Sequence, residues 1–137
     1  MADFLSSLKI AASGLTAQSA RIRVIAENIA NADSAGRTPD DDPYRRRIPT
    51  FEAVMDKQTG GMAVRLGRLG YDMSAFNNRY EPGHPAADAS GYVRYPNVNT
   101  LIETVDMREA QRTYEANLNV VTVTRQMLGR TIDILRG

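Results

Sequence analysis

The sequence predicts a mainly α-helical chain with a small β-rich middle, in which a long helix at each end pairs with the other as a coiled coil. Apolar residues recur every seven positions within residues 1–32 and again within residues 98–137. This spacing gives a narrow stripe along a helix that suits a partner helix. All six prolines and seven of the ten glycines lie in residues 33–97. Helices are therefore expected at the two ends, with strands and loops between them.

Residues 3–32 are predicted to form the first helix. Asp3 or Ser6 can accept a free backbone amide at its start, and Gly36 follows closely enough to stop it. Gly14 weakens the helix by about 1 kcal/mol relative to alanine, and its many small residues offer little area to bury. We therefore expect it to be weak in isolation. The residues that we expect at a helix interface are Phe4, Leu8, Leu15, Ile22, Ile25 and Ile29.

A basic triplet, Arg45 to Arg47, follows Tyr44 near the start of the middle region. Basic residues beside an aromatic ring are able to hold phosphates, but nucleic-acid binding needs an uncompensated basic face. Residues 33–97 carry nine basic and nine acidic side chains. We therefore expect no nucleic-acid partner, and a solvated strand or loop in which these arginines pair with the aspartates at 40–42.

Two strands are predicted in the middle region, at Thr50–Met55 and Met62–Leu66. The second alternates apolar and other residues, and Gly60 with Gly61 provides the turn, so the two segments read as a hairpin. Residues 81–99 contain three prolines and two glycines. Such a composition predicts an extended path with tight turns.

Patterns for catalysis or metal binding are absent from the sequence. His84 is the only histidine, and metal sites need clustered ligands. The absence of cysteine excludes thiolate ligands, disulfides and cysteine nucleophiles. The aspartates at 40–42 lack the spacing of a calcium loop, and no nucleophile elbow or phosphate-binding loop is present. We expect no enzyme, no cofactor, no metal and no small-molecule substrate.

The longest uncharged windows are residues 10–20 and 116–124. Both fall far short of the roughly 20 apolar residues that a membrane span needs. Asp3 stands where a cleavable signal peptide has positive charge, and Lys9 interrupts the short apolar run. We expect neither membrane insertion nor a cleaved signal.

The final helix is predicted within residues 98–137. Thr100 and Glu103 form a capping box, in which each side chain satisfies a free amide of the other's residue. Residues 119–124 favour strand by intrinsic preference and Gly129 weakens a helix. The seven-residue stripe nevertheless passes through both without a break, so we predict helix. Its expected interface residues are Met107, Tyr114, Leu118, Val121, Leu128, Ile132 and Leu135.

Two interpretations of the stripes are open: packing within one chain, or packing between many copies. The stripes exceed what a 65-residue middle region can cover. They also hold the polar residues Gln18, Gln111 and Arg125, and both helices contain destabilising glycines. These features favour helices that become stable only on assembly.

Three stretches of the chain resemble the bacterial flagellar axial proteins, and within them a proximal rod protein of the basal body. The amino-terminal signature shared by rod and hook proteins is similar to residues 12–34, ASGLTAQSARIRVIAENIANADS. A segment that distinguishes the proximal rod protein is similar to residues 81–99, EPGHPAADASGYVRYPNVN, and its carboxy-terminal signature to residues 107–118, MREAQRTYEANL. The motif residues that carry the resemblance are Asn28, Asn31, Pro82, Gly83, Pro85, Gly91, Tyr92, Pro96 and Asn97.

The resemblance implies that both terminal helices form the inner coiled-coil layer of a helical tube, with the middle region outside. It implies a structural function in the periplasmic rod, which transmits torque from the motor to the hook and encloses the export channel. The implied partners are other copies of the chain, other rod proteins and the flagellar type III export apparatus. Two alternatives are a secretion chaperone or adaptor, and a rod or needle subunit of a related type III secretion system; residues 81–99 argue against the second.

Overall fold

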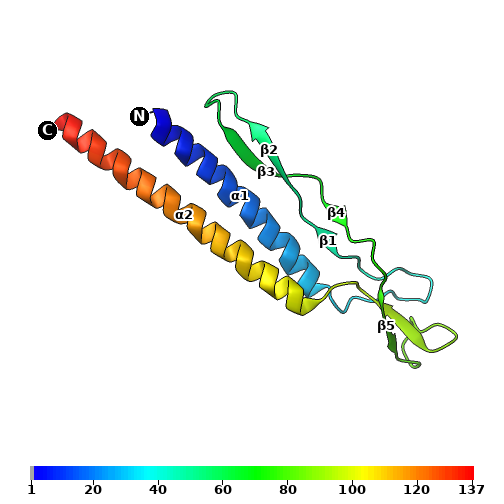
Figure 1. Ribbon diagram of the computed structural model, residues 1–137. Coiled ribbons are helices and arrows are strands. Elements are labelled where there is room, and N and C mark those ends of the chain that lie inside the picture. Colours follow the sequence, from blue (N-terminus) through cyan, green and yellow to red (C-terminus); the bar gives the residue numbers. More distant parts are fainter. Residues whose placement is uncertain (1) are drawn as a thin grey trace. The chain divides into compact units, whose positions relative to one another are not determined.

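The computed structural model describes residues 2–137, and their side chains from residue 4 onward. Its elements are α1 (Ala2–Ala30), β1 (Arg47–Ile48), β2 (Phe51–Met55), β3 (Met62–Leu66), β4 (Gly70–Tyr71), β5 (Asn77–Tyr80), β6 (Tyr92–Tyr95) and α2 (Thr100–Arg136) (Figure 1). The predicted class, two terminal helices with a small β-rich middle, is confirmed. The first helix ends two residues earlier than predicted, and because it already includes Ala2, Ser6 lies inside it. The alternative cap, the side chain of Asp3, lies outside the described side chains.

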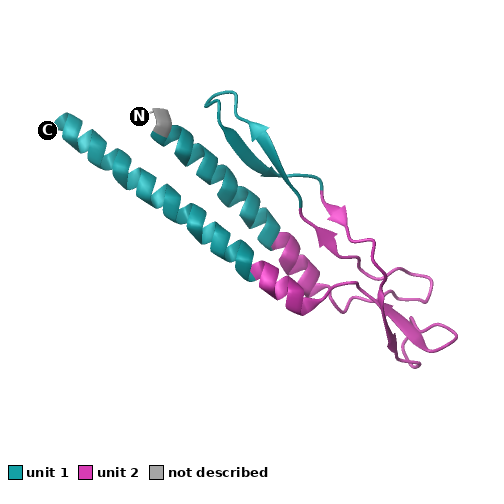
Figure 2. Cartoon of the chain, viewed as in Figure 1, with its two compact units in different colours: residues 1–22, 50–68, 108–137 teal, residues 23–49, 69–107 magenta. Residues whose placement is uncertain are grey.

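The chain divides into two compact units (Figure 2). Unit 1 comprises residues 1–22, 50–68 and 108–137, and unit 2 comprises residues 23–49 and 69–107. Each helix contributes one segment to each unit.

In unit 1 the two helix segments run antiparallel. Arg21 on α1 lies 3.8 Å from the carboxylate of Glu109 on α2. A Cβ built on Gly14 would lie 3.1 Å from the side-chain amide nitrogen of Asn117. The partner's number falls as the α1 number rises, which sets the antiparallel direction. Gly14, which costs intrinsic helix stability, thus allows close approach of α2.

The β2–β3 hairpin of unit 1 packs against α1. Its antiparallel register pairs Phe51 with Leu66 and Met55 with Met62, so the predicted hairpin is confirmed. Gly60 takes a positive φ of 70° in the turn, a conformation that favours glycine. The hairpin is joined to α1 by a hydrogen bond from the backbone N–H of Val64 to Ser13 Oγ (3.1 Å) and by an ion pair between Lys9 and Asp56 (2.8 Å).

Unit 2 contains two further antiparallel strand pairs, β1 with β4 and β5 with β6, which the sequence did not predict. The small core of the β5–β6 pair consists of Ala86, Val93 and Tyr95. The helix start is also different from the prediction. Asn99 Oδ1 accepts the N–H groups of residues 101 and 102 (3.1 and 3.4 Å), so Asn99 is the N-cap of α2. The predicted capping box is wrong, because the carboxylate of Glu103 is buried in another interaction.

Candidate functional site

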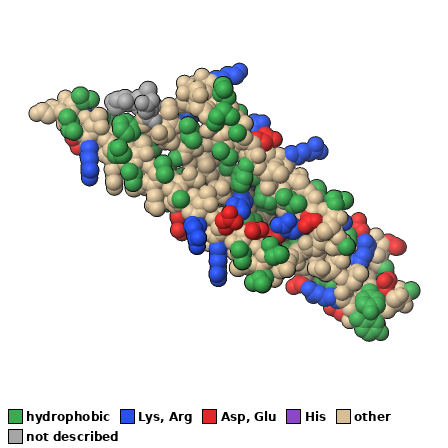
Figure 3. All heavy atoms as spheres, in the orientation of Figure 1, with side chains coloured by type: hydrophobic (Ala, Val, Ile, Leu, Met, Phe, Trp, Pro, Cys, Tyr) green, Lys and Arg blue, Asp and Glu red, His purple; other side chains and the backbone are tan. Residues whose placement is uncertain are grey.

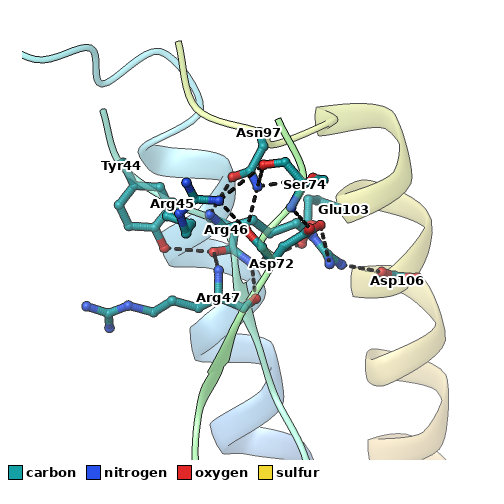
Figure 4. A network of polar contacts seen from close by, with 10 residues as sticks. Tyr44, Arg45, Arg46, Arg47, Asp72, Ser74, Asn97, Glu103 and Asp106 are labelled. Carbon is teal, nitrogen blue, oxygen red and sulfur yellow. Dashed lines mark hydrogen bonds and ion pairs between the residues drawn. The ribbon is translucent and has the colours of Figure 1, made fainter. Parts of the chain in front are cut away.

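The carboxylate of Glu103 is the centre of a polar network in unit 2 (Figure 4). Its side chain is 1% exposed, and Arg46 Nε donates a hydrogen bond to Oε1. The same guanidinium faces two more carboxylates, those of Asp72 (3.6 Å) and Asp106 (3.7 Å). A buried charge is tolerated only when it is paired and hydrogen-bonded. Glu103 therefore depends on Arg46.

Opposing effects act on the guanidinium of Arg46. Burial lowers its pKa, but the hydrogen bond and negative charge of Glu103, together with Asp72 and Asp106, outweigh burial. The pKa of Arg46 is consequently raised above its ordinary value. Arg46 is a permanent cation here, and no proton transfer through it is expected.

Asn28 of α1 has all four side-chain hydrogen bonds satisfied. Its Nδ2 donates to the backbone carbonyl of Arg47 (2.9 Å) and to Glu103 Oε2 (3.3 Å). Its Oδ1 accepts from the backbone N–H of Arg47 (3.0 Å) and from the hydroxyl of Tyr44 (2.7 Å). The side-chain amide of Asn28 thus pairs with both the N–H and the carbonyl of Arg47 in β1, as the backbone of an adjacent strand would. This pairing explains why this helix position needs asparagine. Burial raises the pKa of Tyr44 and keeps it a donor.

Asn97 makes the corresponding connection from the segment before α2. Its Oδ1 accepts the backbone N–H of Arg46 (2.9 Å), and its Nδ2 donates to the carbonyls of Asp72 (2.8 Å) and Ser74 (3.2 Å). The guanidinium of Arg45 donates to the same two carbonyls (2.7 and 3.1 Å). Hydrogen bonds from Ser74 and the neighbouring arginines keep the pKa of Asp72 below its usual range. Three segments far apart in the sequence, residues 45–46, 72–74 and 97, are held together in this way.

The predicted pairing of the arginines at 45–47 with the aspartates at 40–42 is wrong. Arg46 takes the three carboxylates described above, and Arg47 lies 3.3 Å from Glu27 on α1. The physical reason is that the triplet leads into β1, where Arg46 reaches Glu103 on α2 and Arg47 reaches Glu27 on α1, whereas residues 40–42 remain exposed. The three arginines therefore bind other segments of unit 2 and do not form an open basic surface.

The motif residues of segment 81–97 occupy distinct environments. Gly91 takes a positive φ of 84°, and a Cβ there would lie 2.8 Å from the ring of Tyr80. The hydroxyl of Tyr95 donates to Glu81 (2.8 Å), which raises the pKa of Tyr95. Pro96 is buried, whereas Tyr92 and the three residues Pro82, Gly83 and Pro85 are exposed. Asn31, the remaining motif residue, donates to the carbonyl of Glu27 (2.8 Å).

A groove of about 460 Å³ lies in unit 1 between the two helices and the hairpin. Its helical side includes the small residues Ala11, Gly14 and Ala17, and apolar Phe51 and Val64 contribute from the hairpin. The Oε1 atom of Gln18 is buried in this wall and has no hydrogen-bond partner among the described residues. The groove is thus mostly apolar, and the unsatisfied acceptor of Gln18 is not accessible from it.

The expected interface residues separate into three groups by exposure. Ile25 is buried, whereas Leu118 and Leu135 are exposed by 44% and 74%. The others are half-buried: Phe4, Leu8, Leu15, Ile22, Ile29, Met107, Tyr114, Val121, Leu128 and Ile132.

The most buried row of α2 was missed by the sequence analysis. Glu103, Ala110 and Thr124 are 0%, 0% and 9% exposed, and half-buried Asn117 and Thr131 continue the same seven-residue spacing. These side chains are small or polar, so a search for apolar periodicity passes over them. A search for the smallest residues at seven-residue spacing identifies part of this row, since small side chains allow close helix packing.

Among residues 2–137 no group of three or more His, Cys, Asp and Glu side chains is placed to hold a metal ion. None of the described helices is long and apolar enough to cross a membrane.

Comparison with known proteins relates both ends of the chain to the flagellum. Residues 8–36 match the family described as "Flagella basal body rod protein", and residues 89–134 match "Flagellar basal body rod FlgEFG protein C-terminal". The first range includes Asn28, and the second includes Asn97 and Glu103, three members of the network in unit 2.

Curated relatives are similar over nearly the whole chain. The flagellar basal-body rod protein FlgC of Agrobacterium fabrum is 52% identical over 129 residues, which cover 94% of this chain and 93% of the relative. The FlgC proteins of Borreliella burgdorferi and Salmonella typhimurium are 40% and 39% identical, with 96% and 95% of this chain covered and 97% and 96% of the relatives. The resemblance to a proximal rod protein noted in the sequence is thereby confirmed, and the chain belongs to the FlgC family of flagellar basal-body rod proteins.

Proposed function

We propose that this structural subunit of the flagellar basal-body rod assembles through its terminal helices with other copies of itself and with other rod proteins. The assembly forms a coiled-coil layer of a helical tube in the periplasm, which transmits torque and encloses the export channel. The chain has no catalytic role in this proposal. The observation that carries it is the amount of apolar surface that the isolated chain leaves exposed on α2.

Large apolar side chains are exposed on the second half of α2, and four of them, Val120, Val123, Met127 and Ile134, lie within about 60° of one another around the helix (Figure 3 shows hydrophobic side chains at the surface of one face of the molecule). An exposed apolar stripe of this kind marks a surface for contact with another protein. Burying one such side chain contributes about 2 kcal/mol. Burial of several of these side chains against neighbouring subunits would therefore stabilise the assembly. The exposed residues of this segment are Leu118 (44%), Val120 (48%), Val123 (52%), Met127 (48%), Ile134 (80%) and Leu135 (74%).

The expected interface residues are the proposed contacts of this layer. Residues that are half-buried in the isolated chain, such as Leu15 and Tyr114, retain area for a neighbour. A contact of this kind is heterologous, because one surface meets a different surface on the next copy. Such contacts continue into a ring or helix instead of closing as a dimer.

We further propose that the chain reaches the rod through the flagellar type III export apparatus, without a cleaved signal. Both helices contain an internal glycine, and the row of α2 that faces inward is made of small and polar residues. Such helices gain little stability before assembly. Low stability in the free chain favours passage through a narrow channel in an unfolded state.

Leu118→Asp tests the assembly surface, with Leu118→Met as its control. Leu118 is 44% exposed, so the aspartate is hydrated in the free chain and its far-ultraviolet circular dichroism should be unchanged. A charge enclosed between subunits cannot be hydrated. The aspartate variant should therefore be missing from purified basal bodies and its cells should not swim, whereas the methionine variant should be retained.

Normal swimming with Leu118→Asp would contradict the assignment of this surface. If the unaltered chain were absent from basal bodies and bound one exported protein in fixed stoichiometry in the cytoplasm, it would be a secretion chaperone or adaptor instead.

A further inference from the structure

The β2–β3 hairpin of unit 1 has one covered edge and one open edge. The backbone N–H of Gly67 donates to the carbonyl of Thr50 (2.6 Å), and bonded pairs alternate with non-bonded pairs along an antiparallel ladder. The N–H of Val64 therefore points away from β2, and it donates to Ser13 Oγ on α1. On the other edge, the N–H and carbonyl groups of residues 51, 53 and 55 point away from β3, and no group of the described residues bonds to them. The β2 edge is thus available to pair with another strand.

The β5–β6 pair of unit 2 also has an open edge. The N–H of Tyr92 on β6 donates to Asp88 Oδ1, and the N–H of Asp88 donates to the carbonyl of Tyr92 (both 2.9 Å). Both groups of Tyr92 therefore point away from β5. The register pairs Tyr92 with Tyr80, so the backbone groups of Tyr80 and of Asn78 point away from β6. Nothing among the described residues bonds to these groups, and all four residues of β5 are exposed.

The two open edges are complementary in one antiparallel register. Their outward groups face each other when residue 51 lies opposite 80 and residue 53 lies opposite 78. This register places Glu52 opposite Arg79, and the two side chains are 49% and 50% exposed. It also places Phe51 beside Tyr80, which already packs edge-to-face on Tyr92 with ring centroids 5.3 Å apart. Opposite charges and aromatic rings on directly opposed residues stabilise paired strands.

Other pairings of these edges lack this match. A shift of two residues in one direction places Val54 opposite Arg79, and a shift in the other direction places Pro49, which has no N–H to donate, opposite Tyr80. Pairing two β5 strands with residue 78 opposite 80 places Arg79 opposite Arg79, and like charges directly opposite each other are destabilising. The charges therefore favour β2 with β5 over two β5 strands.

We propose that β2 of one copy pairs antiparallel with β5 of a second copy, with Glu52 opposite Arg79. The two hairpins then form one four-stranded sheet in the order β3, β2, β5, β6, held by main-chain hydrogen bonds as in other cases of strand addition. Each copy keeps one open edge for the next, so the contact is heterologous and continues along a helical assembly. The inference rests on the proposed assembly function and adds a contact outside the terminal helices.

Cysteine cross-linking tests the contact directly, because the chain contains no cysteine. Two differently tagged copies are produced together in the source bacterium in place of the native chain, one with Ala53→Cys and the other with Asn78→Cys. Directly opposed residues of this kind have Cα atoms about 5.5 Å apart, a distance that a disulfide spans. Mild oxidation of purified basal bodies should give a product that carries both tags.

The matched control replaces Ala53→Cys by Val54→Cys. Neighbouring residues of a strand point to opposite faces of the sheet, so Val54→Cys should give no mixed product with Asn78→Cys. A mixed product of equal yield would overturn the register. A disulfide between two Ala53→Cys copies in place of the mixed product would overturn the proposal, because it requires β2 to pair with itself.

Charge reversal tests the pairing of Glu52 with Arg79 in the same assay. Glu52→Lys in the first copy, or Arg79→Glu in the second, places like charges opposite each other and should lower the mixed product about fivefold. Both changes together should restore it to within about twofold. Within one chain Glu52 lies 3.1 Å from Arg65 and Arg79 lies 3.2 Å from Asp33. Loss of these internal ion pairs alone would make the two effects add, and an additive loss would refute the contact between copies.

Two outcomes separate this inference from the proposed function. If the chain is retained in basal bodies but Ala53→Cys and Asn78→Cys give no mixed product, the strand pairing is wrong and the structural function stands. If the unaltered chain is absent from basal bodies, the proposed function fails and this inference fails with it.

Discussion

Arg46→Met is the substitution whose effect follows most directly from the geometry of unit 2. Among the described residues, Arg46 is the one cation within 4 Å of the Glu103 carboxylate. Replacing it by methionine keeps the length of the stem and leaves a buried charge without its partner. Loss of one member of a buried pair costs about 3–5 kcal/mol. The Arg46 side chain is 21% exposed, so water screens part of this cost.

We expect Arg46→Met to destabilise unit 2 by about 3 kcal/mol. The assay is native-state hydrogen exchange at the backbone amide of Arg47, which donates to Asn28 Oδ1 inside the network. Exchange at one amide reports local opening without requiring that the whole chain unfold together. A loss of about 3 kcal/mol corresponds to roughly a hundredfold lower protection.

The control combines Arg46→Met with Glu103→Gln. Glutamine keeps the shape of the side chain and an oxygen that accepts from Asn28 Nδ2, but it carries no charge. The double variant should therefore lie within about 1 kcal/mol of the native chain, since no unpaired charge remains. Unchanged protection in Arg46→Met, or a double variant that is no better than the single one, would refute the view that Arg46 compensates Glu103.

Two smaller predictions follow from the turns and ion pairs. Gly91→Ala should lower stability by about 1–3 kcal/mol in urea unfolding, because it adds a Cβ at a positive φ against the ring of Tyr80; Gly83→Ala, where no atom lies within 4 Å of the new Cβ, should change it by less than about 0.5 kcal/mol. The hydrogen bond from Lys9 keeps the pKa of Asp56 below its ordinary value, so its stabilisation is present above pH about 4 and is lost as the pH falls through that lowered pKa. Lys9→Met should move the Asp56 titration, followed by nuclear magnetic resonance, back toward pH 4, and an unmoved titration would contradict the ion pair.

The elements predicted from the sequence are those with strong local signals. The β2–β3 hairpin has alternating residues and a glycine pair at its turn, both of which act over a few residues. Helix α2 runs through residues 119–124 in spite of their strand preference, as the unbroken seven-residue stripe predicted. The short pairs β1–β4 and β5–β6 have no such pattern, since their positions depend on side chains distant in sequence.

The network of unit 2 could not be predicted for a related reason. Glu103 stands where a capping-box residue belongs, and Asn99, directly before the first residue of α2, is an equally good cap. Only the fold shows that Arg46 and Asn28 reach the carboxylate. The arginine triplet has aspartates close in sequence, and nothing local indicates that its partners are more than ten residues away.

The two units differ in whether their buried polar groups have hydrogen-bond partners and in how much apolar surface stays exposed. This difference suggests that the polar network of unit 2 serves folding and the helices of unit 1 serve assembly. In unit 2 the buried polar groups of Asn28 and Glu103 have partners within the unit. In unit 1 an acceptor of Gln18 is buried without a donor, and apolar side chains of α2 remain exposed. Unit 2 is therefore expected to be ordered in the free chain, whereas the helix segments of unit 1 gain their stability from neighbours.

Leu118→Asp should then abolish incorporation into the basal body with no change in amide protection at Arg47, and Arg46→Met should lower that protection in the free chain. If Leu118→Asp lowered protection at Arg47 in the free chain, folding and assembly would depend on the same contacts, and this division of roles would be wrong.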